Sequence, residues 1–371
     1  MATGFFRRFT KRFFLIFNII FCVAFLLACL VPLLNPVDWW FMGFLGIVLP
    51  YLALILVLWI LFWWFIKPKL SLLSIICLLI GYKQIGVLIA MNAPTSFEIK
   101  KDENNIRVAN WNIRSFLGIS DNREKQMQSR TEISDALKRI NADVLCLQEF
   151  NHSYTKSYIN NLSLFTSVFP YYYFSKDFKR DEGTYASGCI IFSKFPIIDT
   201  GKAKYPGKFA ESIIYADVVK GNDTVRIFTT HLLSFRFNSA DYEGMDRVKD
   251  DPEAIAASKN IIRKMKHAFT RRGEQADIAK KEISSSPYPS VLTGDFNDIP
   301  NSYTYFTLKG VRKDAFLQRG LGIGRTYITL APTLRIDYIL PDREFDVIQF
   351  DMIDEDLSDH LLLVADLKLK K

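Results

Sequence analysis

Leu292-Thr-Gly-Asp-Phe-Asn-Asp298 is the stretch that decides how the rest of the chain is interpreted. Apolar residues lead into Gly294, and Asp295 and Asn297 then follow two positions apart. On an extended strand, residues at i and i+2 point to the same side, so a carboxylate and a carboxamide are predicted to face one point. Taken alone, Gly-Asp-x-Asn is equally good turn chemistry. A site is favoured because polar residues end or interrupt other strand-like runs in the same way.

These other polar groups are Asn112, Glu149, His231, Asp337 and the run Ser358-Asp-His360. Each has a structural explanation of its own: a turn, a strand that surfaces, a structural histidine, or an ion pair with Arg335 on one strand face. A carboxylate that ends a buried strand is costly unless it is exposed or coordinated, and oxygen ligands suit Mg²⁺ or Mn²⁺. A histidine beside a carboxylate can serve as a general base near neutral pH. Their joint presence, in a chain with only 4 His, favours a site that handles metal and protons.

The composition separates an apolar beginning from an ordinary globular remainder. Hydrophobic residues make up 49% of the 371 positions, and the excess lies in the first 90 residues. The formal net charge of +8 suits an anionic partner such as a membrane surface, nucleic acid or phosphoester, without choosing among them. Of the 5 Cys, Cys22, Cys29 and Cys77 lie in apolar segments, whereas Cys146 and Cys189 are predicted to be buried free thiols in strands.

Residues 1–91 are predicted to form a membrane region with three transmembrane helices, at about 13–34, 40–66 and 70–90. Paired Trp residues border the second segment, as expected at a bilayer interface. Basic residues precede the first segment and follow the second, while the loop 35–38 has none. The positive-inside rule then predicts a multi-pass protein of the plasma (inner) membrane with its later domain on the extracytoplasmic side. If the third segment, interrupted by Lys83 and Gln84, does not span, the domain is cytoplasmic.

Residues 92–105 are predicted to be a polar linker, and 106–371 a domain with a helical insertion at 236–286. Many strand patterns occur without strict alternation with helices, which predicts a layered α+β sandwich. Helices are expected at 129–140, 154–165, 254–269 and 275–283. The basic residues of the insertion could lie against anionic headgroups, follow a nucleic-acid backbone, or form a solvated face.

Six motifs occur in a family-specific order along the domain, namely Trp111-Asn-Ile-Arg114, Leu147-Gln-Glu149, Thr230-His-Leu232, Gly294-Asp-Phe-Asn297, Arg335-Ile-Asp-Tyr338 and Ser358-Asp-His360. Over residues 106–369 the sequence resembles the endonuclease/exonuclease/phosphatase superfamily, the group that contains DNase I. The resemblance implies a four-layer fold, with two packed mixed β-sheets flanked by helices, and Mg²⁺-dependent phosphoester hydrolysis.

The resemblance also implies a role for each matched residue. Asn112, Glu149 and Asp359 would lie around the metal, His360 would activate water, and Asp337 would orient His360.

Asp295 and Asn297 would hold the nucleophile and the phosphoryl oxygens. His231 would bind phosphate or help to protonate the leaving group, and Arg114 would contact phosphate. One departure from the family pattern is that no acid stands around Tyr185–Ser187 to partner His231.

Fold and motifs leave the phosphoester open. The membrane region favours a lipid-linked phosphate, and the plan of three apolar segments before such a domain resembles membrane phosphatases that act on a polyprenyl pyrophosphate carrier. A nuclease acting on DNA or RNA is the alternative, and a non-catalytic phosphate-binding module is a remote one. The expected partners are therefore the bilayer and the phosphoester. No protein partner, oligomeric state or number of metals can be inferred.

Overall fold

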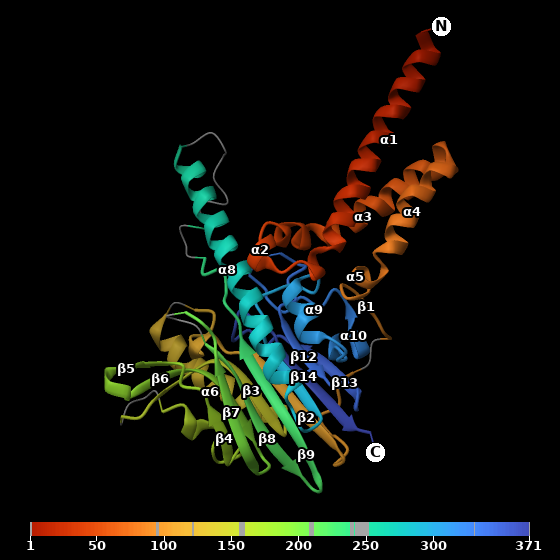
Figure 1. Cartoon of the computed structure of the whole chain (residues 1–371). Helices are drawn as coiled ribbons and strands as arrows, with labels where there is room; N and C mark the ends of the chain where they lie inside the picture. The colour runs from red at the N-terminus through yellow and green to blue at the C-terminus, as the bar shows by residue number, and fades with distance from the viewer. Residues whose placement is uncertain are drawn as a thin grey trace.

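The computed structural model of the chain describes residues 2–93, 96–120, 122–155, 160–207, 211–237, 241, 252–329 and 331–370. Its centre is a pair of packed β-sheets (Figure 1). The first sheet has, in order, β12 (Asp337–Pro341), β10 (Ser290–Asp295), β9 (Asp223–His231), β8 (Ser212–Lys220) and β7 (Ile197–Lys204). The second has β13 (Phe345–Ile353), β14 (Leu362–Leu369), β2 (Asn105–Asn112), β3 (Val144–Ser153), β6 (Tyr185–Ser193) and β4 (Tyr171–Phe174), with β5 (Phe178–Arg180) paired to β6.

The two sheets bury one shared core. Val108 and Val144 of the second sheet pack in the same cluster as Ile227 and Val291 of the first. Strands at the centre of each sheet are covered on both faces, so they read as nearly continuous apolar runs. Each central pair, β2 with β3 and β9 with β10, is parallel, which brings the carboxyl ends of both strands to one edge.

Helices cover the outer face of each sheet. On the second sheet lies α6 (Arg123–Arg139), which buries Ile133 and Leu137. On the first lie α8 (Pro252–Ser284) and α9 (Tyr303–Lys309), which contribute Ala279 and Leu308 to a separate cluster. Helix, sheet, sheet and helix make four layers, so the predicted α+β sandwich is confirmed.

The N-terminal region is helical and stands on one side of the sheets (Figure 1). It contains α1 (Ala2–Cys29), α2 (Pro36–Trp39), α3 (Met42–Ile66), α4 (Ser71–Ile80) and α5 (Tyr82–Gly86). Residues Phe9–Leu33 and Met42–Ile66 are each long and apolar enough to cross a membrane. The helices pack on one another through a cluster that includes Phe25 and Leu56.

The predicted third transmembrane helix at 70–90 is wrong as a continuous helix. It is broken at Gly81, and the chain enters the short strand β1 (Ala90–Met91), which pairs with β11 (Leu321–Gly322). A Cβ at Gly81 would lie 2.5 Å from the ring of Phe25, so close packing against α1 requires glycine here. At 1.5 Å per residue, α4 spans roughly 15 Å, about half of a bilayer core.

Two further predictions fail, namely the break between two helices in the insertion and the helix at 154–165. The helices expected at 254–269 and 275–283 are parts of the single helix α8, because residues 270–274 continue it. In place of a helix at 154–165, the described residues form a bend directly after β3 and the short 3-10 turn Leu162–Leu164. Residues 156–159 of that segment, and residues 238–240 and 242–251 of the predicted insertion, lie outside the described residues.

Candidate active site

The strand ends that carry polar residues meet at one edge of the sandwich. Asp295, the last residue of β10, pairs with His231 of β9 on one side and with Asp337 of β12 on the other. The backbone approach is close, since a Cβ at Gly294 would lie 2.1 Å from the carbonyl oxygen of Thr230, and Gly294 has a φ of +145°. Glycine is therefore required before Asp295.

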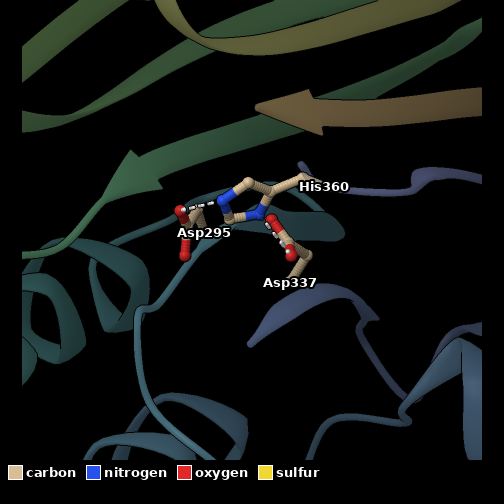
Figure 2. Close-up of side chains that lie close together, drawn as sticks. All are labelled: Asp295, Asp337 and His360. Carbon is tan, nitrogen blue, oxygen red and sulfur yellow. Dashed lines mark hydrogen bonds and ion pairs between the residues drawn. The ribbon is translucent and has the colours of Figure 1, made fainter. Parts of the chain in front are cut away.

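His360 lies between two carboxylates. Figure 2 shows its imidazole with Asp337 on one side and Asp295 on the other. Nδ1 is 2.9 Å from Oδ2 of Asp337, and Nε2 is 3.7 Å from Oδ2 of Asp295. Burial by itself would lower the pKa of His360, but the attraction of Asp337, Asp295 and Asp359 for the imidazolium outweighs it and raises the pKa to about 10.

His231 has an acidic partner that the sequence did not reveal. Its Nδ1 is 2.9 Å from Oε1 of Glu211, and its Nε2 is 3.6 Å from Oδ2 of Asp295. Burial would lower the pKa of His231, but Glu211, then Asp295 and Glu149, raise it to about 10. The predicted lack of a partner is therefore wrong. Glu211 stands just before β8, whose Ile213 pairs with Thr230 of β9, so the acid comes from a neighbouring strand rather than from residues 185–187.

Asn112 joins the two sheets at this edge. Its Nδ2 donates to Oδ2 of Asp295 over 3.0 Å and to Oε1 of Glu149 over 3.3 Å. Glu149 has a φ of +55° at a register irregularity between Leu147 and Phe150, and such a bulge redirects a side chain. Burial raises the pKa of Glu149. None of the described Lys or Arg side chains forms an ion pair with its carboxylate.

Asn297 differs from the same-face prediction. β10 ends at Asp295, and Asn297 has a φ of +51°, so the two residues do not continue one strand. The backbone N–H of Asn297 donates to Oδ1 of Asp295 over 2.8 Å, and its Nδ2 donates to the carbonyl oxygen of Leu232 over 2.9 Å. The turn chemistry of this motif is therefore real, and Asn297 still faces the cavity described below.

Arg114 and Asp359 lie together on the opposite rim. Nε of Arg114 is 3.8 Å from Oδ2 of Asp359, and its Nη1 donates to the carbonyl oxygen of Gly118 over 2.9 Å. The Arg114 side chain is 39% exposed, which leaves it accessible to an anion. By contrast Arg335, whose ion pair with Asp337 was the structural alternative, pairs instead with Asp314 at 2.6 Å. Asp337 is thus free to orient His360.

A cavity of about 380 Å³ brings these residues together. One wall is polar and holds every predicted site residue except Asp337, which lies behind His360: Asn112, Arg114, Glu149, His231, Asp295, Asn297, Asp359 and His360. The apolar part of the lining, called the apolar wall below, consists of Ile47, Leu117, Phe235, Phe237, Phe269, Ile299, Leu334 and Ile336, and the remaining lining residues are Ser234, Arg236, Asp298 and Tyr327. A second, polar cavity of about 270 Å³ shares Glu149 and His231 with the first.

Residues 109–360 match the model of the Endonuclease/Exonuclease/phosphatase family. The chain belongs to this family. Its members are phosphoester hydrolases that generally use divalent metals. Residues 11–88 match a second model, described as Domain of unknown function (DUF8431).

Solved structures share the family fold. An endonuclease/exonuclease/phosphatase from Beutenbergia cavernae DSM 12333 is 21% identical, with a TM-score of 0.52 over 72% of each chain. A humanized D. rerio TDP2 with 14 mutations is 15% identical, with a TM-score of 0.50 over 71% of this chain and 99% of that one. At these identities the likeness concerns the fold. No curated protein matches the chain.

Two groups of residues at this edge fit a divalent metal of the kind that the family uses. Asp295, Asp337 and His360 place ligand atoms within 4.8 Å of one another, and Oδ1 of Asp337 is buried with no hydrogen-bond partner among the described atoms. Glu149, Asn112 and Asp359 also carry side-chain oxygens and line the cavity. In the first group both nitrogens of His360 already face carboxylates, and in the second no described Lys or Arg forms an ion pair with the half-buried carboxylate of Glu149.

Proposed function

We propose that the protein is a membrane-anchored, divalent-metal-dependent phosphoester hydrolase in which His360 and Asp337 activate water. The observation that carries this proposal is the position of Asp295, whose Oδ2 faces the Nε2 atoms of both His360 and His231. A water held there would contact His360, which pairs with Asp337. His231, which pairs with Glu211, faces the same point from the other side. Attack on a phosphate and departure of an alcohol need these two proton-handling groups.

The chain's own residues support the following reaction. His360 keeps Nδ1–H on Asp337, so Nε2 takes a proton from the water while the water oxygen bonds to phosphorus. The ester P–O bond breaks, and the leaving oxygen takes the proton of His231, which Glu211 orients. Asn297 and Arg114 contact the phosphoryl oxygens.

Glu149, Asn112 and Asp359 would hold Mg²⁺ or Mn²⁺. The bound cation would neutralise phosphoryl charge and lower the histidine pKa values.

The structure also supports a location on the extracytoplasmic side. Nδ2 of Asn301 donates to the carbonyl oxygen of Ala28 over 3.1 Å, and Nδ2 of Asn35 donates to Asp277 over 3.0 Å. The domain therefore lies at the C-terminal end of α1, whereas the basic N-terminus lies at the far end (Figure 1). If α1 crosses a membrane with its basic end in the cytoplasm, the domain lies outside. Because α3 would then return to the cytoplasmic side, residues 67–89 must cross back for the domain to lie outside.

A lipid-linked phosphate is the proposed substrate, ahead of nucleic acid. The cavity joins the catalytic edge to an apolar wall, which suits an amphiphile better than a polyanion. The basic residues of α8, which suited either substrate, are partly used within the protein. Lys264 pairs with Asp241, Arg271 with Glu274, and the buried Arg272 with Asp298.

The experiment uses the full chain in detergent, with Mg²⁺ or EDTA, beside a matched His360→Ala variant. Each is offered plasmid DNA, RNA, a long-chain polyprenyl phosphate and phospholipid vesicles. We expect phosphate-ester cleavage of the lipid substrates alone, abolished by EDTA and reduced by about two to four orders of magnitude in the variant.

Cleavage of DNA or RNA with the same dependence on metal and on His360 would overturn the lipid preference and identify a nuclease. Loss of metal-dependent turnover on all four substrates would leave only the phosphate-binding module.

A further inference from the structure

The apolar wall of the active-site cavity includes a residue of the N-terminal region. Ile47 belongs to α3, one of the two helices long and apolar enough to cross a membrane. The remaining apolar lining comes from the domain, with Phe269 on α8 nearest in the packing to α3. A helix that only anchored the domain would not need to line the cavity that holds His360 and Asp359.

Glycines bring α3 into contact with the domain. A Cβ at Gly43 would lie 2.8 Å from the ring of Phe269, and one at Gly46 would lie 2.8 Å from the carbonyl oxygen of Asn301. Phe44 packs edge-to-face on Phe269 with the ring centroids 5.6 Å apart. The hydrogen bond from Asn301 to Ala28 holds the end of α1 at the same place. The position of Ile47 beside the catalytic edge is thus fixed on two sides.

From Ile47 an apolar stripe continues along α3. Tyr51, Leu54 and Leu58 stand four, seven and eleven positions later, on the same helical face as Ile47. Their exposed fractions are 43%, 58% and 55%, so this face is open over its length. A hydrocarbon chain lying on it would remain in the bilayer while its phosphate reached the catalytic edge.

The start of this stripe lies at the level expected for headgroups. Trp39 and Phe41 are 46% exposed just before α3 begins, and Trp is enriched at the membrane–water interface. Lys266 of α8 stands 4.8 Å above the ring of Trp40. A lysine over an interfacial tryptophan marks the depth at which lipid phosphates lie.

We propose that α3 and α8 form a binding site for the hydrocarbon chain of the substrate, with Ile47 and Phe269 at its mouth. The substrate then enters sideways from the bilayer and is not extracted into water. The membrane region is part of the specificity site. This inference rests on the proposed function, because it assigns the chain of a lipid-linked phosphate to this path.

The test compares Ile47→Trp with Val48→Trp in the full-length protein. Val48 is the adjacent residue, 39% exposed, and it does not line the cavity. The substrates are a long-chain polyprenyl phosphate and isopentenyl phosphate, which share a head group. We expect Ile47→Trp to lower kcat/KM for the long substrate by about tenfold or more and to leave the short one within about twofold. Val48→Trp should leave both unchanged.

A second measurement does not depend on turnover. A polyprenyl phosphonate that carries a diazirine along its chain is photo-crosslinked to the protein in EDTA. We expect the crosslink on α3 near Ile47 or on α8 near Phe269, with competition by polyprenyl phosphate and loss in Ile47→Trp.

Crosslinking near Ile47 or Phe269 without any hydrolysis of lipid phosphates would overturn the proposed function and keep the binding site for the hydrocarbon chain. Hydrolysis with crosslinks elsewhere, or equal losses on both substrates in Ile47→Trp, would overturn the chain site and keep the function.

Discussion

Replacing Glu211 by Gln tests the role of the histidine pair that the sequence did not reveal. The substitution keeps the shape of the side chain and an acceptor for Nδ1 of His231, but it removes the negative charge 2.9 Å away. Oε2 of Glu211 also accepts from Sγ of Cys189 over 3.4 Å. The amide can keep only one of these contacts unchanged, so His231 loses its charged partner without a change in packing volume.

The geometry sets the size of the effect. A hydrogen bond to a charged group contributes about 1.5–3 kcal/mol. The Glu211 side chain is 25% exposed, so solvent screening and the neutral bond that Gln retains reduce the loss to about 1–2 kcal/mol. At about 1.4 kcal/mol per tenfold, kcat/KM should fall about five- to thirtyfold. His231→Ala removes the proton donor itself and should cost about two to four orders of magnitude.

The assay follows cation-dependent release of inorganic phosphate from a long-chain polyprenyl phosphate by the full-length protein in detergent, because its alcohol leaving group needs the proton that His231 supplies. Glu355→Gln is the matched control. Glu355 pairs with Arg139 over 2.7 Å and does not line the cavity, so this substitution should not alter the rate. Adding Glu211→Gln to His231→Ala should cause no further loss, because the two residues act as a unit. A Glu211→Gln rate equal to that of the unchanged protein, or as low as that of His231→Ala, would refute the reasoning.

Three further outcomes are expected. Gly294→Ala should destabilise the fold by about 3 kcal/mol or more, because its Cβ would lie 2.1 Å from the carbonyl oxygen of Thr230. Denaturation in detergent measures this loss, and an unchanged denaturation midpoint would contradict it. Mg²⁺ should raise the unfolding temperature, EDTA should reverse the rise, and Glu149→Gln should abolish it; a rise retained in that variant would place the metal elsewhere. Asp314→Asn should cost about 3–5 kcal/mol, because it leaves the buried guanidinium of Arg335 uncompensated, and a loss below about 1 kcal/mol would show that another group compensates it.

The strands that carry the site could be predicted because their buried residues form apolar runs in the sequence. The apolar runs before His231 and Asp295 correctly predicted strand ends, and the register of β9 and β10 places these two residues opposite each other. The strand end predicted at Glu149 is wrong, because β3 continues to Ser153. Free thiols at Cys146 and Cys189 follow from the same burial and are confirmed. Convergence of the polar groups at one edge follows from the two parallel central pairs, whereas the family resemblance implied only two packed mixed sheets.

The features that were missed depend on contacts between distant segments. Glu211 reaches His231 only because β8 lies beside β9, and nothing near either residue in sequence marks the pair. Asn297 leaves the strand direction because the chain turns at Phe296 to bond Leu232, which alternation cannot show. The break in the third apolar segment follows from the packing of Gly81 on Phe25 of another helix. In each case the deciding partner lies at least 20 residues away.

The residues that attach the N-terminal helices to the domain lie on the same chain segments as residues of the catalytic edge. Asn301, which holds the end of α1, comes four residues after Asn297. Arg335, whose Nη2 donates to the carbonyl oxygen of Val87 over 2.6 Å, comes two residues before Asp337. A shift of the helices against the domain would therefore move the loops that set the Asp295–His360–Asp337 geometry. For this reason the family fold supports the chemistry, and we propose that the docking of α1 and α3 on these loops selects the substrate.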